Sequence, residues 1–325
     1  MESAIQEYDN QMREEMDLAL NAVRIQEALV SRGHVVECAD FGPDLIATAQ
    51  KAREFGAEIG FNLIECPLQC SDKEPHGAAF FELMNLPYTG NDPYAISVCK
   101  NKALTKCACA FGGIPTPAFK VCHAPLRSRV PLNYPVIVKP IEEDGSEGIS
   151  ENSVVETEAM LRRRVGEVFE RFKRPVLVEE YIEGRELNMA VWGNGTAEDP
   201  YEVLPPAELL YHSKLWRVCS FESKWLADHP SYHEITARCP AEIPDELKRR
   251  LERLTLACAR TFRLSGYARV DLRVDRKGRA FVLEVNPNPD LSPEVGFARN
   301  AAAAGFSFEQ VVEEIVALGI ARGTR

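Results

Sequence analysis

The sequence predicts an α/β protein made of α+β lobes, with a parallel sheet in its N-terminal lobe. Helix-like and strand-like segments alternate through the first part of the chain, as they do where helices cover the faces of a parallel sheet. The chain also has 325 residues, a length greater than one compact core usually holds. Hydrophobic residues make up 45% of it. We expect three lobes, at residues 1–95, 96–180 and 181–325.

The first lobe is expected to open with an amphipathic helix that ends at Gly33. Its apolar stripe would be formed by Met16, Leu20, Val23 and Val30. Strand, helix, strand and short helix should follow, at 34–38, 45–55, 58–64 and 78–85. Because the sequence starts close to the first helix, we expect this lobe to lack its first strand.

The central lobe should contain two helices and three strands. The predicted helices are 101–111 and 157–172, and the predicted strands are 116–122, 135–139 and 175–181. In the last lobe we expect a strand, a helix, a hairpin and a final helix opened by a capping box at Ser307 and Gln310. The strand is expected at 185–192 and the helix at 245–264. The hairpin should pair 267–274 with 280–285, and the final helix should start at 307.

Four polar residues stand at the end of that hairpin: Arg269, Asp271, Glu284 and Asn286. Residues two apart on a strand face the same side, so each strand contributes one pair to a shared patch. Two carboxylates and an amide oxygen suit Mg²⁺, with Mn²⁺ as an alternative, and the arginine suits developing negative charge. The alternative is a solvated charged face of the hairpin. The apolar residues around Glu284 argue against it, because a solvated strand would be more polar.

A second candidate is Lys139, which ends a strand that reads as buried. An ammonium there is costly unless it meets an anion. The following loop contains Gly145, Ser146 and Gly148, which can turn backbone N–H groups and a hydroxyl toward phosphates. Neither a GxxxxGK[ST] loop nor a strand followed by GxGxxG is present.

A third candidate is the acidic strand end at 178–186. Its backbone could hydrogen-bond an adenine, and Glu179 or Glu186 could accept from the amino group of the base or from ribose hydroxyls. An exposed acidic connector is the alternative for this segment.

In order along the chain, these motifs resemble the ATP-grasp superfamily, and more closely the D-alanine–D-alanine ligase family. The matching segments are Leu86–Gly90, Asn101-Lys102 with Thr105-Lys106, Val138–Pro140 with its serine–glycine loop, Glu179–Glu186, Arg269–Asp271 and Leu283–Asn286. The resemblance covers most of the chain from about Leu29. It implies an ATP-grasp fold, in which two α+β lobes clasp the nucleotide behind the N-terminal lobe.

The resemblance also implies roles for individual residues. Lys102 and Lys139 would contact ATP phosphates, and Ser146 would assist at the reacting phosphate. The segment with Glu179, Glu180 and Ile182 would hold adenine, Glu186 the ribose, and Lys224 would belong to a lid. Asp271, Glu284 and Asn286 would bind Mg²⁺, while Arg269 would stabilise the charged intermediate. The implied reaction activates a small carboxylate as an acyl phosphate and joins it to an amine.

Two regions depart from the family pattern. Asp290 stands where the family has glycine, and Val295 or its neighbour stands where a serine would hold the carboxylate of the second substrate. A carboxylate at Asp290 would repel that group and attract an amine or a cation. At the N-terminus, Glu14, Glu15 or Asp17 could replace the family's substrate-binding glutamate.

Composition limits the remaining possibilities. The formal net charge of -11 argues against nucleic acid or an anionic membrane as a general partner. No apolar run is long enough to span a bilayer, and no secretory signal is visible, so we expect a cytosolic protein. The ten cysteines lack zinc-site spacing. By analogy with the family, a homodimer is expected.

Three other readings stay open at this point. The first is synthesis of D-alanyl-D-alanine itself, as a special case of the ligase. The second is an ATP-binding regulatory module without turnover, suggested by the missing first strand. The third is an α/β protein that binds a sugar or another cofactor.

Overall fold

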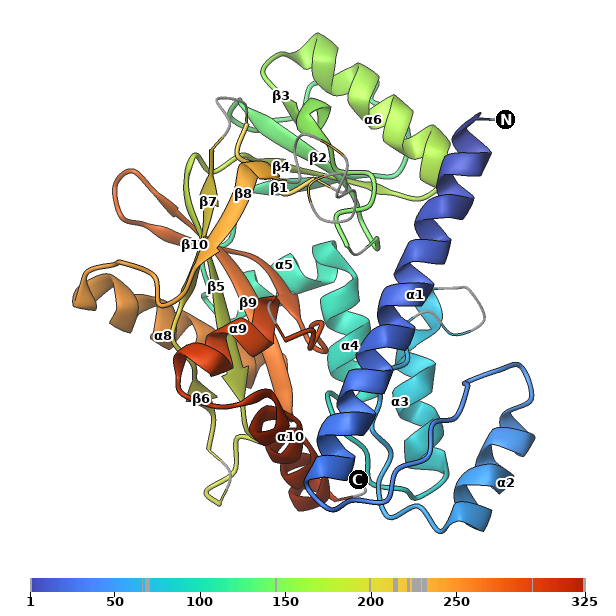
Figure 1. Cartoon of the computed structure of the whole chain (residues 1–325). Coiled ribbons are helices and arrows are strands. Elements are labelled where there is room, and N and C mark those ends of the chain that lie inside the picture. Colours follow the sequence, from blue (N-terminus) through green and yellow to red (C-terminus); the bar gives the residue numbers. More distant parts are fainter. Residues whose placement is uncertain are drawn as a thin grey trace.

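The structure is a computed structural model that describes residues 2–65, 67, 71–143, 145–198, 200–212, 216–220, 223, 229, 233–293 and 295–323. Two antiparallel sheets form its framework, with helices around them (Figure 1). The α-helices are α1 (Glu2–Ser31), α2 (Leu45–Phe55), α3 (Glu74–Leu83), α4 (Pro93–Lys100), α5 (Lys102–Phe111), α6 (Glu158–Phe172), α8 (Asp245–Thr261), α9 (Gly296–Ala303) and α10 (Phe308–Arg322). The strands are β1 (Phe119–Cys122), β2 (Val136–Pro140), β3 (Val154–Val155), β4 (Val176–Glu180), β5 (Gly184–Trp192), β6 (Glu202–Val203), β7 (Ala207–Tyr211), β8 (Ile235–Arg238), β9 (Tyr267–Asp275) and β10 (Ala280–Asn286).

The parallel sheet predicted for the first lobe is not formed among the described residues. Segments 34–38 and 58–64 are not strands, contrary to the prediction. Parallel pairing there is limited to a bridge between Gly60 and Tyr88, with hydrogen bonds from Gly60 N to Pro87 O and from Thr89 N to Gly60 O. A strand needs a ladder along its length, and this segment meets only the turn after Pro87.

Helix α1 buries a different face from the predicted one. The four residues of the predicted stripe are all exposed: Met16, Leu20, Val23 and Val30. The buried face consists of Ile25, Ala28, Leu29 and the polar Asn21. Both sets have helical spacing, so periodicity alone could not separate them. Packing against α10 decides the outcome, because it covers the second set.

The four-stranded sheet has the strand order β1-β4-β2-β3. Helix α6 covers one face of it with Leu161, Val165 and Val168, which pack on the valines of β2 and β4. Side chains alternate between the faces of a strand, so Lys139 of β2 and Glu179 of β4 point to the opposite side. That side faces the rest of the candidate active site.

The larger sheet has the order β10-β9-β5-β7-β8, with β6 added to β5. Alternate residues of β5 enter two different cores. Leu187 and Met189 pack in the core that contains α5 and α8, whereas Ala190 and Trp192 pack in the core that contains α9, α10 and α1. The second face is apolar at one end of the sheet and polar at the other. The polar end carries the candidate active site.

Several elements were not predicted. Strands β6, β7 and β8 lie in the proline-containing stretch before α8, and α4 and α9 are short. Their sequences are too brief for a clear periodic signal. In the described part of the chain, no helix is long and apolar enough to cross a membrane.

Candidate active site

A one-residue bulge in β10 builds the polar end of the hairpin. Val282 pairs with Leu272, but Glu284 pairs with Asp271 and Asn286 with Arg269, so Leu283 is the extra residue. Strict alternation from Val282, whose side chain is in the core, would have turned Glu284 toward the core as well. The bulge shifts the alternation by one residue and brings Glu284 and Asn286 to the face that carries Asp271.

The bulge is held in place by the segment that follows α5. Val282 N donates to Pro115 O at 2.8 Å, and Thr116 Oγ1 donates to Val282 O at 2.8 Å. Leu283 O accepts a hydrogen bond from the Lys106 ammonium at 3.4 Å. The geometry of the hairpin is therefore coupled to a buried lysine of the neighbouring helix.

Asp271 lies at the centre of a dense polar cluster. Arg269 binds both of its oxygens, with Nε–Oδ1 at 2.8 Å and Nη2–Oδ2 at 2.9 Å. Asn188 of β5 donates to Oδ1 at 2.6 Å, and Asn286 donates to Oδ2 at 3.0 Å. The bidentate pair fixes the arginine on the surface where a negative charge would be stabilised.

The donor set of this cluster fits a hard divalent cation. Asp271, Glu284 and Asn286 supply carboxylate and amide oxygens, the ligands that Mg²⁺ prefers. Burial raises the pKa of Asp271; Arg269 counteracts this, while the nearby charges of Glu284 and Glu186 add to it. Such crowding of carboxylates is relieved by a cation. Elsewhere in the described part of the chain, no group of three or more His, Cys, Asp or Glu side chains is arranged to hold a metal ion.

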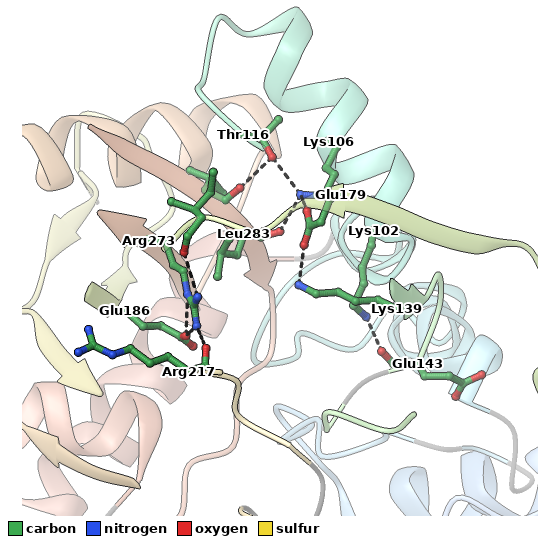
Figure 2. A network of polar contacts seen from close by, with 12 residues as sticks. Lys102, Lys106, Thr116, Lys139, Glu143, Glu179, Glu186, Arg217, Arg273 and Leu283 are labelled. Carbon is green, nitrogen blue, oxygen red and sulfur yellow. Dashed lines mark hydrogen bonds and ion pairs between the residues drawn. The ribbon is translucent and has the colours of Figure 1, made fainter. Parts of the chain in front are cut away.

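Glu179 is buried between two lysines. Its side chain is 1% exposed and pairs with Lys106 and, at 2.6 Å, with Lys139 (Figure 2). Burial alone would raise the pKa of Glu179, but the two ammonium groups lower it to about 2. The sequence predicted that Lys139 lies close to an anion, and in the structure the carboxylate of Glu179 is such an anion. Lys106 was not assigned a role from the sequence, although its burial on a short helix is unusual for a lysine.

Lys102 and the loop after β2 lie close together. The Lys102 ammonium donates to the carbonyl of Glu143, at the start of that loop (Figure 2). Gly145, Ser146 and Gly148 all have positive φ, of 60°, 67° and 70°. Consecutive turns of this kind direct backbone N–H groups to one side, as phosphate-binding loops do. Ser146 is thus in a loop of the predicted type.

Glu186 is engaged with a residue that the sequence reasoning missed. Arg273 donates to its Oε2 from Nε at 3.1 Å and from Nη2 at 2.7 Å, and Tyr211 donates to the same oxygen at 2.8 Å. Arg273 also lies 4.7 Å above the centre of the Tyr181 ring. The available signal was the alternation of charged and apolar residues along this strand, which places Arg273 on the same face as Arg269 and Asp271.

The segment after β4 is held by hydrogen bonds from neighbouring residues. The carboxylate of Glu180 accepts from the Asn133 backbone at 2.9 Å and from its side chain at 2.7 Å, so it points away from the site. Ile182 O accepts from Arg273 at 3.0 Å. Within the described residues, the Ile182 N–H makes no hydrogen bond and is available to a planar base. Lys224, the predicted lid lysine, lies outside the described residues.

The hairpin residues and the lysines thus come from different elements and meet in one region. The structure brings together Arg269, Asp271, Glu284 and Asn286, and it links Lys139 to Glu179. Along β9, residues 267, 269, 271 and 273 share a face, and successive members are separated by about 7 Å. One strand therefore runs from the apolar core, through the proposed catalytic arginine and metal site, to the Arg273–Glu186 pair.

Comparisons with known proteins identify the family of this chain. The family model for the D-ala D-ala ligase C-terminus matches residues 118–317. A D-alanine–D-alanine ligase of Desulforudis audaxviator is 33% identical, with 94% of each chain covered, and an uncharacterized protein of Sinorhizobium fredii is 34% identical over 79% of this chain and 73% of its own.

Solved structures show the same fold. The D-alanine–D-alanine ligase of Bacillus anthracis complexed with ATP superposes with a TM-score of 0.68 at 21% identity, with 86% of this chain and 84% of that chain covered. VanG D-Ala:D-Ser ligase of Enterococcus faecalis superposes with a TM-score of 0.64 at 22% identity, with coverages of 81% and 73%. The chain therefore belongs to the D-alanine–D-alanine ligase family and is an ATP-dependent ligase of the ATP-grasp fold that forms carbon–nitrogen bonds.

Proposed function

We propose that this ligase activates a small carboxylate with Mg-ATP and joins it to a small amine. The polar residues of the hairpin would act as one site with Lys102 and Lys139. The observation that carries the proposal is the convergence of Arg269, Asp271, Glu284 and Asn286 through the bulge at Leu283. A solvated hairpin face would not need a bulge to turn its carboxylates away from the core.

The nucleotide would lie between the two sheets. Lys102, Lys139 and the loop with Ser146 would contact its phosphates, since they place two ammonium groups and a hydroxyl near the end of β2. The Ile182 N–H would bind the adenine. Glu186, held by Arg273 and Tyr211, would accept from the ribose. Glu179 would act on the nucleotide mainly by fixing the ammonium of Lys139.

In the first step, an oxygen of the substrate carboxylate attacks the γ-phosphorus of ATP, ADP leaves, and an acyl phosphate forms. In the second, the neutral amine attacks the acyl carbon, phosphate leaves, and the nitrogen loses a proton. Arg269 would stabilise the oxyanion that develops in the second step, and its bidentate contact with Asp271 holds the guanidinium in position.

Asp271, Glu284 and Asn286 would hold Mg²⁺. The ion would supply neutralisation of phosphate charge, which is the main catalytic requirement of phosphoryl transfer. The fit rests on the oxygen-only donor set and on the carboxylate crowding around Asp271.

The test is ADP release by the whole chain in Mg-ATP, with single and paired L- and D-amino acids, amino-acid amides and small amines. Release that requires one carboxylate together with one amine is the expected result. Arg269→Lys should lower the rate by about 100-fold while the thermal stabilisation by Mg-ATP persists, because the charge remains and the bidentate geometry is lost. Release of ADP at an equal rate with no added substrate would contradict the proposal.

A further inference from the structure

Lys106 joins the two sheets at the proposed nucleotide site. It lies on α5, one helical turn after Lys102, and only 1% of its side chain is exposed. Its ammonium pairs with Glu179 of β4, and it donates to Thr116 Oγ1 at 3.1 Å and to Leu283 O of β10 at 3.4 Å (Figure 2). The smaller sheet therefore meets the larger one through the side chain of Lys106.

The partners of Lys106 leave it no donor for a substrate. An ammonium has three N–H groups, and the three oxygens around Lys106 match that number. Lys139 differs, because 11% of its side chain is exposed and, in the described part of the chain, its ammonium pairs with Glu179 alone. Lys139 therefore keeps N–H groups for phosphate oxygens, whereas Lys106 could reach a phosphate only by giving up a partner.

The two lysines share the carboxylate of Glu179, one on each oxygen. Oε2 pairs with Lys106, and Oε1 pairs with Lys139 at 2.6 Å. Burial lowers the pKa of Lys106, and the charge of Glu179 opposes that shift. Two ammonium groups against one carboxylate leave positive charge in excess, and Lys139 is the member that is partly exposed. Without Lys106, Glu179 would neutralise Lys139 alone, and the attraction for phosphates would fall.

Lys106 also supports the bulge that places Glu284. Leu283 is the residue that the pairing of β10 with β9 skips, and its carbonyl accepts from Lys106. Thr116 accepts from Lys106 as well, and its hydroxyl donates onward to Val282 O at 2.8 Å. Two successive carbonyls at the bulge are thus held by Lys106 and its neighbour, and the residue that follows them is a proposed metal ligand.

A purely stabilising role explains this arrangement less well. Removing two ammonium groups and a carboxylate from water costs free energy, and their mutual attraction offsets that cost only in part. A methionine at position 106 would fill similar space without a buried charge. The contacts of Lys106 are therefore better explained by what they fix in the two neighbouring sheets.

We propose that Lys106 is a positioning residue of this ligase with two separable roles. Through Glu179, it keeps the charge of Lys139 available to the phosphates of the nucleotide. Through the carbonyl of Leu283, it keeps Glu284 on the face that would bind the metal. The inference rests on the proposed nucleotide and metal sites, and binding measurements test it without turnover.

The experiment is calorimetric titration of the whole chain with ADP, in the presence and in the absence of Mg²⁺. Lys106→Met should weaken the binding of metal-free ADP about tenfold, because Glu179 then neutralises Lys139. It should also reduce the gain in affinity that Mg²⁺ gives the wild type, because Glu284 loses its fixed position. Thermal unfolding without ligand gives a temperature at which every variant is folded.

Two further variants separate the roles. Lys106→Met combined with Glu179→Gln leaves Lys139 charged and without a carboxylate. It should therefore bind metal-free ADP within about threefold of the wild type, while the Mg²⁺ gain stays reduced. Thr116→Val keeps every charge and removes a support of the bulge, so the Mg²⁺ gain should fall and the binding of metal-free ADP should not. A merely structural role predicts the opposite, because losses would accumulate in the double variant.

Lys51→Met is the matched control. The Lys51 ammonium also pairs with a carboxylate and a backbone carbonyl, Glu37 Oε1 and Cys38 O, both at 3.1 Å. It lies on α2 with half of its side chain exposed, so its loss should leave both measurements at the wild-type values.

Unchanged binding of metal-free ADP in Lys106→Met would overturn the proposal, and so would a double variant that binds it no better than Lys106→Met. If Lys106→Met does not fold, a double variant that binds metal-free ADP far more weakly than the wild type, or an unchanged Mg²⁺ gain in Thr116→Val, would overturn it. These outcomes leave the proposed function standing as long as the wild type binds ADP. A wild type that binds no ADP would overturn the proposed nucleotide site, and the role of Lys106 with it.

Discussion

Glu284 of β10 lies opposite Asp271 of β9, and the two carboxylates share a face because Leu283 is bulged out of the register between them. Such a bulge lowers the stability of a buried hairpin, since it leaves one residue without a hydrogen-bonding partner in the ladder. Here the carbonyl of the bulged residue is taken up by Lys106. The arrangement gathers negative charge on a surface that also holds Arg269, which is what a metal-dependent phosphoryl transfer requires.

The first prediction concerns that carboxylate pair. Glu284→Gln should lower the rate of ADP release by at least about 100-fold, because an amide oxygen is a far weaker ligand for Mg²⁺ than a carboxylate. The melting temperature without ligand should change little, since glutamine has nearly the same shape as the glutamate that it replaces. Steady-state ADP release across a range of Mg²⁺ concentrations measures the effect. Glu246→Gln, on the exposed side of α8, is the control and should behave like the wild type.

An unchanged rate in Glu284→Gln would show that Glu284 does not hold the ion. Partial recovery of the rate at high Mg²⁺ would support the assignment, because weaker binding is overcome by concentration.

The sequence predicted the residue types of this site but not the long-range contacts that bring them together. Residue type and spacing along the chain were enough to predict that Arg269, Asp271, Glu284 and Asn286 share one face of the hairpin, and the register confirms this. Their roles toward a metal and a phosphate stay predictions. The bulge that makes them converge depends on contacts with Pro115 and Thr116, residues far away in the sequence. No local pattern contains that contact.

Other misses have similar causes. The stripe predicted for α1 and the buried face that the structure shows have the same helical spacing, and only the position of α10 distinguishes them. The segment 58–64 has the composition of a strand, but among the described residues it pairs only through the Gly60–Tyr88 bridge. The burial of Glu179 between Lys106 and Lys139 became visible only with three elements in place, while its contact with the nucleotide stays a prediction. Cytosolic location and a homodimer stay predictions.

The second prediction concerns pH. Because two ammonium groups hold the pKa of Glu179 near 2, below its usual value of 4.5, its charge stabilises the fold fully above about pH 4.5. That stabilisation, on the order of 3 kcal/mol, should be lost as the pH falls from 4.5 to 2. Glu179→Gln should unfold more easily than the wild type at pH 7, since it leaves two buried lysines without a carboxylate.

Urea unfolding between pH 2 and pH 7 tests this. The difference in free energy of unfolding between the wild type and Glu179→Gln should shrink as the pH falls through that window. Glu180→Gln, one residue away with its carboxylate on Asn133, provides the control. A difference that stays constant with pH would mean that Glu179 is not the titrating group.

The third prediction uses the close approach of a glycine to Arg269. A Cβ at Gly296 would lie 2.9 Å from Arg269 Nη1, and the residue has a φ of +44°. Gly296→Ala should therefore cost about 1–2 kcal/mol of stability through its backbone and also displace the guanidinium. A displacement of that kind lowers turnover by roughly 10- to 100-fold.

Gly278→Ala separates the two effects. Gly278 has a φ of +75°, and a Cβ there would meet no atom within 4 Å. It should lose stability without loss of turnover, as measured by thermal unfolding and by ADP release at a temperature where both variants are folded. Equal turnover in the two variants would show that the guanidinium tolerates the added methyl group.

The last prediction concerns Arg273, which holds Glu186 and the carbonyl of Ile182 on the proposed nucleotide side of the site. Lysine at this position keeps the charge but cannot bind both acceptors or stack on Tyr181 in the same way. Arg273→Lys should therefore raise the KM for ATP by about tenfold and leave kcat nearly unchanged, since Glu186 and Ile182 would lose their fixed positions and Arg269 and Asp271 would not. Arg276→Lys is a matched control, because Arg276 pairs with exposed Glu183 in the same hairpin. If Arg273→Lys instead lowers kcat with an unchanged KM for ATP, Arg273 serves the reacting centre and the nucleotide must lie closer to Asp271 than proposed.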